Sequence, residues 1–291
     1  MNISSPYFAT RAFFVVSYLA AAGACLAAPA GQGAGGQQNG MQAVPTDLQQ
    51  TELHSLTDVQ RQPGVKIDAR EQSAYDAFYR VKPELVEKKI QLGNTFLAKY
   101  PSSVFAEAVD AGLVNAYYAK QDWKNFYATA DRALALRPDD VDVLTTVGWV
   151  IPHFYDARAD DADDQWTRAE TFEKHAIEVL GKMSKPADLT EEQFTAAKAQ
   201  KEIQAHSALG LVYFRRSDYA NSAAELQRSL ENNKNPDQTD LFVLGIDFQN
   251  LNQFSDAAAA FDRCAQQVGG LQDRCKQSVE AVKKQVAQPK P

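Results

Sequence analysis

One short residue pattern recurs along the chain at a fixed spacing, and this pattern constrains the fold most strongly. A large apolar residue precedes a small one, an aromatic residue follows three positions later, and a second aromatic follows six positions after that. The clearest copies run over 113–138, 209–230 and 244–265. Gly210 and Gly245 occupy the small position 35 residues apart, and Val114 and Gly148 occupy it 34 residues apart. A period of this length predicts a solenoid of helical hairpins.

Close crossing of two helices explains the small residues. Where the backbones approach, only Gly, Ala or Ser fits, so we expect Gly148, Gly210 and Gly245 at the crossing on each first helix. The second helices would place small residues opposite them: Ala133, Ala169, Ala176, Ser222, Ser229 and Ala257. The aromatic residues would then fill the space between neighbouring hairpins.

Polar residues and prolines predict where the helices begin and end. Asp218 is expected to cap a second helix, and Thr190 with Gln193 has the pattern of a capping box. Asn235 is expected to be a cap, with Pro236 at the first helical position. Pro152 is expected to end the first helix of the third unit, so that 152–165 forms a long connection.

The stretches "NAYYAKQDW" and "ADRALALRP" within 113–138 resemble the tetratricopeptide repeat, and the resemblance extends over about residues 66–267. It implies an all-α, right-handed superhelical solenoid of about five helix-turn-helix units. The expected units are about 67–101, 104–138, 139–182, 190–231 and 235–267. A polar-faced capping helix over 271–286 would close the solenoid, because its end needs a soluble surface. Residues 287–291 would be a tail.

The resemblance also implies that the first helices line a concave groove. Residues expected to point into it are Asn115, Tyr118, Thr145, Trp149, Ser207, Leu211, Phe214, Phe242 and Ile246. Family members that bind a chaperone's C-terminal carboxylate use basic and asparagine residues there, and only Asn115 matches. Such an apolar groove favours a protein or peptide partner with apolar anchors. The cap helix or the N-terminal spacer could equally cover the groove, and both interpretations stay open.

The N-terminus has the pattern of an export signal. A polar start ending in Arg11, an uncharged apolar run and "APA" predict a signal peptide over 1–30, cleaved after Ala30. Two alternatives stay open: the run could remain as a membrane anchor, or Cys25 could carry lipid. Residues 31–66 are largely Gly/Gln-rich and are expected to form a flexible spacer.

Two cysteines flank the glycine pair Gly269–Gly270, which would separate the last repeat helix from the cap. Cys264 and Cys275 lie about equally far from this break, so an antiparallel hairpin could bring them together. In an exported protein they would form a disulfide. Two buried thiols are the alternative.

Catalytic, metal-binding and phosphate-binding motifs are absent from the sequence. The aspartates of 156–164 lack the spacing of a calcium loop, and a net charge of −7 without basic clusters argues against nucleic acid. We therefore expect no cofactor and no metal. The favoured hypothesis is a non-catalytic, exported interaction scaffold in a bacterial periplasm. The alternative is an envelope lipoprotein or anchored subunit of an assembly machine, and an accessory enzyme has no supporting residue set.

Overall fold

The computed structural model describes residues 67–187, 189–231 and 233–287, which form eleven α-helices and no strand. The predicted signal peptide, its alternatives at Cys25, nearly all of the spacer and residues 288–291 lie outside the described residues. The first six helices are α3 (Ala69–Tyr79), α4 (Val86–Lys99), α5 (Ala106–Lys120), α6 (Trp123–Leu136), α7 (Val141–Phe154) and α8 (Ala162–Lys182). The remaining five are α9 (Glu191–Arg215), α10 (Tyr219–Leu230), α11 (Gln238–Asn250), α12 (Phe254–Gln266) and α13 (Gln272–Ala287).

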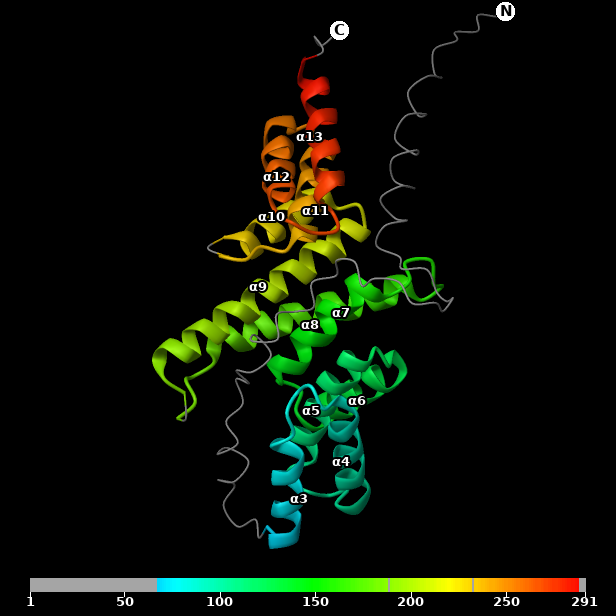
Figure 1. Ribbon diagram of the computed structural model, residues 1–291, viewed down its shortest axis with the longest axis vertical. Coiled ribbons are helices and arrows are strands. Elements are labelled where there is room, and N and C mark those ends of the chain that lie inside the picture. The colour runs from blue at the N-terminus through cyan, green and yellow to red at the C-terminus, as the bar shows by residue number, and fades with distance from the viewer. Residues whose placement is uncertain (1–66, 188, 232, 288–291) are drawn as a thin grey trace, which may run out of the picture.

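Successive helices pack as antiparallel pairs, and each pair stacks on the next. The pairs are α3/α4, α5/α6, α7/α8, α9/α10 and α11/α12, and α13 packs against α12. Figure 1 shows α3–α6 at one end of the long axis and α10–α13 at the other, with α7, α8 and α9 running across the middle. This arrangement is a helical solenoid.

The three predicted crossing glycines each lie against the second helix of their own pair. A Cβ atom added at Gly210 would lie 2.5 Å from Cγ of Leu226, and one at Gly245 would lie 2.5 Å from Cε1 of Phe261. At Gly148 it would collide with the Glu173 carboxyl group. The small residues predicted on the second helices are all fully buried: Ala133, Ala169, Ala176, Ser222, Ser229 and Ala257. The predicted glycine crossings are therefore confirmed, but the side chains nearest to the three glycines are the large Glu173, Leu226 and Phe261.

The turn inside three of the pairs has the same backbone geometry. One residue of each turn has a positive φ of 58–59°: Gln121, Ser217 and Asn252. The N–H of the following residue donates to the carbonyl of the predicted first aromatic residue, at 2.8–3.0 Å: Tyr117, Tyr213 and Phe248. This bond closes the C-terminus of the first helix. The repeat therefore extends to individual backbone bonds.

Some helix ends agree with the sequence and others do not. The capping box of Thr190 and Gln193 is confirmed, and the Asp218 carboxylate accepts the N–H of Asn221. The cap of α11, however, is Asp237, whose carboxylate accepts the N–H of Thr239 at 2.6 Å. The prediction of Asn235 as the cap was wrong, because the charged acceptor lies two residues later and Pro236 stays outside the helix.

Pro152 does not end α7, which continues to Phe154. A proline removes one backbone bond, but here the residue is buried, and its carbonyl accepts a bond from Nη2 of Arg215 at 2.9 Å. The proline is therefore accommodated inside α7, where it is buried and its own carbonyl is bonded. Because α8 already begins at Ala162, the connection is only 155–161, shorter than the predicted 152–165.

Helix α9 joins two separate hydrophobic cores. Val212 packs into a core built by α3–α8, and the preceding Leu211 packs into a core built by α9–α13. Between α9 and α7 the contacts are both apolar and polar. Ala197 packs with Val141 and Leu180 in a smaller third core, and Nζ of Lys201 lies 2.7 Å from Oδ1 of Asp142. Helix α9 therefore connects the two halves of the solenoid through apolar packing and an ion pair.

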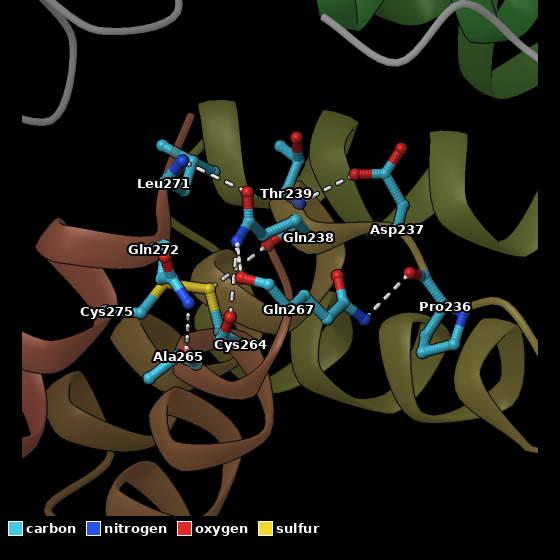
Figure 2. The surroundings of a disulfide bond; sticks show 10 residues. All are labelled: Pro236, Asp237, Gln238, Thr239, Cys264, Ala265, Gln267, Leu271, Gln272 and Cys275. Atoms are coloured by element: carbon cyan, nitrogen blue, oxygen red, sulfur yellow. Dashed lines mark hydrogen bonds between the residues drawn. A yellow bond between two sulfur atoms is a disulfide. The ribbon is translucent and has the colours of Figure 1, made fainter. Parts of the chain in front are cut away.

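The C-terminal cap is fastened at its first turn. A disulfide joins Cys264 of α12 to Cys275 of α13 (Figure 2). Beside it, the Gln238 side chain donates from Nε2 to the carbonyls of Cys264 and Gln267, each at 3.2 Å, and accepts the N–H of Leu271 at 3.0 Å. The start of α11 therefore holds the turn between α12 and α13 through the Gln238 amide group, and Nε2 of Gln267 donates back to the Pro236 carbonyl at 3.1 Å.

Candidate peptide-binding face

The nine residues predicted to line a groove have different environments. Six are half-buried: Asn115, Tyr118, Trp149, Phe214, Phe242 and Ile246. Three are buried, with relative exposures of 0% for Thr145, 4% for Ser207 and 1% for Leu211. The structure therefore corrects the prediction for these three side chains, which do not reach the surface.

Neighbouring helices explain why these three are covered. The Thr145 hydroxyl donates to the Val141 carbonyl of its own helix at 2.8 Å. The Ser207 hydroxyl donates to the Asp240 carboxyl group of α11 at 2.8 Å, and Leu211 belongs to the C-terminal core.

Phe242 is half-buried, and the last two helices of the solenoid cover part of its side chain. Its ring lies 5.7 Å from that of Phe261 in α12, and the guanidinium of Arg274 in α13 lies 5.6 Å above it. The cap helix therefore covers this position in part, as one of the two sequence interpretations expected.

Five half-buried rings meet where α5, α6 and α7 come together: Tyr118, Trp123, Trp149, His153 and Phe154. We call them the aromatic cluster. Phe154 links them, because its ring centroid lies 5.1 Å from Trp123, 5.9 Å from Trp149 and 6.3 Å from Tyr118. Tyr118 and Trp149, both predicted from the repeat register, are 6.4 Å apart.

Local structure places these rings together. Tyr118 lies in the last turn of α5, and the left-handed residue Gln121 reverses the chain so that Trp123 begins α6. Trp149 and His153 are one helical turn apart in α7, which puts them on the same face. Phe154 can join because α7 continues past Pro152. The sequence prediction missed Phe154 and His153 because it ended that helix too early.

The cluster carries no charge at neutral pH. His153 stacks on Trp149 at 3.8 Å, and its Nδ1–H donates to the Trp149 carbonyl at 2.7 Å. Burial, assisted by the nearby charge of Arg215, lowers the pKa of His153 to about 4 against the opposing effect of Asp237. Burial also raises the pKa of Tyr118 to about 12. These rings therefore offer apolar faces with few polar atoms.

The two other histidines among the described residues each contact an acidic side chain of a neighbouring segment. His175 contacts Asp139 and His206 contacts Glu225, at 2.7 and 2.6 Å. Within the described ranges no group of three or more histidine, cysteine or acidic side chains could hold a metal ion. The same ranges contain no helix with the length and apolar character needed to cross a membrane.

The acidic connection between α7 and α8 is also engaged locally. The Tyr155 hydroxyl donates to the Asp161 carboxylate at 2.7 Å, and Arg158 pairs with Asp156 at 3.1 Å. Its aspartates therefore stabilise the connection itself.

Comparison with solved structures gives matches of low sequence identity. A thermophilic TPR protein of Thermus thermophilus matches with 13% identity and a TM-score of 0.41, over 72% of this chain and 99% of that one. A tetratricopeptide repeat protein from Parabacteroides merdae matches with 10% identity and a TM-score of 0.31, over 74% and 100%. The TPR domain of P58(IPK) matches with 11% identity and a TM-score of 0.28, over 74% and 65%.

No protein-family model matches the sequence, and no sequence match to a curated protein is found. The assignment of the units therefore rests on the internal repeat, the glycine crossings and the shared turn geometry. On that basis the described chain is an all-α solenoid of tetratricopeptide-like helical hairpins.

Proposed function

We propose that this chain is a non-catalytic scaffold that binds a peptide or protein segment on the face formed by its first helices. The observation that carries the proposal is the aromatic cluster, in which four rings of the first helices α5 and α7, together with Trp123 at the start of α6, are only half-buried. Large aromatic side chains that keep part of their surface in water are typical of binding faces. Their low charge favours a partner with apolar side chains.

The geometry of a solenoid supports the same function. Each hairpin contacts only its neighbours, so equivalent positions on successive first helices form one extended surface. Tyr118 and Phe214 are such positions, each four residues after the small position of its unit, and Trp149 lies one residue after the small position of the unit between them. An extended or helical segment can contact several of these positions at once.

We place this activity in the bacterial cell envelope, on the charged–apolar–small pattern of residues 1–30. Export would also allow the disulfide between Cys264 and Cys275 to form. Mass measurement of the mature protein tests this directly. A mature chain beginning at Gly31 supports a free periplasmic protein, and a lipid-bearing Cys25 in the membrane fraction supports an anchored subunit instead.

A pull-down from the native envelope tests the binding face. The bait is the mature protein, compared with a Trp149→Ala/Phe214→Ala variant and with a Leu136→Ala control on a second helix, where the side chain is exposed. We expect a protein that the wild type and the control capture and the double variant loses. Circular dichroism must show that all three baits are folded. Equal capture by all three would contradict the proposed face.

A further inference from the structure

Arg215 is a half-buried cation that lacks an acidic partner within the described residues. The neighbouring Arg216 contacts Asp163 at 3.1 Å and Glu170 at 2.5 Å. Elsewhere in the solenoid, Arg132 pairs with Asp110 at 2.6 Å. No carboxylate of the described ranges lies within ion-pair distance of Arg215, although Arg215 and Arg216 are both half-buried.

The contacts of Arg215 position its guanidinium without neutralising it. Nη2 donates to the carbonyl of Pro152 at 2.9 Å, and the guanidinium lies 5.7 Å from the ring centroid of Trp166. Nε is buried and has no acceptor among the described residues. The planar group is therefore held between α7 and α8 by a carbonyl and an aromatic face. Because Nε is enclosed, the N–H donors that a ligand can reach are those of the terminal Nη atoms.

The electrostatics agree with this geometry. Burial lowers the pKa of Arg215, and no nearby carboxylate acts in the opposite direction. Enclosing a cation without a counter-charge is costly in free energy. A carboxylate would remove much of that cost, because a guanidinium binds it through two parallel N–H donors.

Arg215 also lies beside the aromatic cluster. The carbonyl that it holds belongs to Pro152, which directly precedes His153, and the charge of Arg215 contributes to the low pKa of His153. Phe214, the residue before it, is half-buried and was predicted on the binding face. A partner that places an apolar side chain on the cluster would therefore bring its next residues close to this guanidinium.

We propose that Arg215 is a binding site for a carboxylate side chain, an aspartate or glutamate that follows or precedes an apolar residue in the bound segment. The inference rests on the proposed function, because it identifies the chemistry of the partner of that same face. The larger basic set that binds a chain-terminal carboxylate is missing here, so an internal acidic residue is the ligand that the site fits.

Nuclear magnetic resonance of the arginine Nε–H groups tests the site without knowledge of the natural partner. The probe is the blocked tripeptide N-acetyl-Leu-Glu-Leu-amide, and its control is the same peptide with Gln. We expect the Glu peptide to shift the Arg215 signal saturably in the millimolar range, whereas the signal of Arg216, which already has acidic partners, stays unchanged. An unmoved Arg215 signal, or an equal shift with the Gln peptide, would overturn the proposal.

Two variants assign the effect to this side chain. Arg215→Met should weaken binding of the Glu peptide by roughly tenfold or more, because it removes a charged hydrogen-bond donor. Arg274→Met is the matched control, since Arg274 also lies over an aromatic ring but on the cap helix, and it should bind as the wild type does. Equal binding by Arg215→Met would also overturn the site.

The failure of this site and the failure of the scaffold give different results. If the Glu peptide leaves Arg215 unmoved while envelope capture still depends on Trp149 and Phe214, the carboxylate site is wrong and the scaffold stands. If capture does not depend on those two residues, the binding face itself is wrong.

Discussion

Substitution of Gly210 by alanine tests the helix crossing on which the repeat register depends. An added Cβ would lie 2.5 Å from Cγ and 2.7 Å from Cδ2 of Leu226, whereas ordinary contact begins at 3.4 Å. Leu226 would have to move by about 0.9 Å to reach that distance. Its side chain is fully buried, so there is no open space to receive it. Overpacking of this kind costs about 1–3 kcal/mol.

Gly181→Ala provides the matched control. Gly181 also lies in a helix, but nothing is within 4 Å of the position of its Cβ. Alanine gains up to about 1 kcal/mol over glycine from helix propensity at either position. Because Gly181 is the penultimate residue of α8, its gain is the smaller of the two, so the difference between the two free energies of unfolding is a lower bound on the cost of the collision. We expect Gly210→Ala to be less stable than Gly181→Ala by about 1–3 kcal/mol.

Urea unfolding followed by far-ultraviolet circular dichroism measures this difference, provided that the denaturant slope is unchanged. Adding Leu226→Ala should restore part of the loss relative to the sum of the two single changes, because the smaller side chain makes room for the new methyl group. If Gly210→Ala and Gly181→Ala gain equal stability, the assigned crossing is wrong.

Three further predictions concern buried groups. Burial raises the pKa of Asp240 to about 7 and of Asp247 to about 8. Since these folded-state values exceed the unfolded value of 3.8, the stabilisation is complete below about pH 4 and is lost as pH rises through 7 and 8. The free energy of unfolding should be measured at pH 5 and pH 8. It should change less with pH in Asp240→Asn/Asp247→Asn than in the wild type, by up to about 1.4 kcal/mol per pH unit for each group. Glu173 is fully buried with no hydrogen-bond partner among the described residues. Glu173→Met should therefore raise the melting temperature and increase the free energy of unfolding by about 1–4 kcal/mol. A lower melting temperature would contradict this. Peptide maps of the mature protein with and without reductant should differ at Cys264 and Cys275, and identical maps would refute the disulfide.

The repeat could be predicted from the sequence because its determinants are local. Gly210 and Leu226 belong to one hairpin, and the turn between them needs only a left-handed residue and a cap. These requirements recur at the same place in each unit, so a period of about 35 residues identifies them without knowledge of the rest of the chain.

The side chains of the first helices were harder to predict, because their exposure depends on the neighbouring unit. Ser207 has the register of a groove residue, yet its hydroxyl bonds Asp240 in the following hairpin. Ser229, predicted only as a small crossing residue, donates to the same carboxyl group at 3.0 Å. The spacing of Asp240 and Asp247, seven residues apart on the same apolar helix, was a signal for such buried contacts.

The position of Arg215 also depended on tertiary structure. Its acceptor is the carbonyl of Pro152, 63 residues away, and α7 reaches that point only because the proline is accommodated. A sequence rule that ends helices at proline therefore cannot predict the aromatic cluster or this contact.

Site-specific photo-crosslinking in cells that express the full-length protein tests the central claim most directly. A benzophenone side chain is placed at Asn115, a half-buried position on a first helix beside the aromatic cluster, and in a second protein at Leu136, an exposed position on a second helix. We predict that a discrete partner is crosslinked from Asn115 and not from Leu136, and that Trp149→Ala abolishes this product. A product formed from Leu136 alone, or equally from both positions, would contradict binding on the face formed by the first helices.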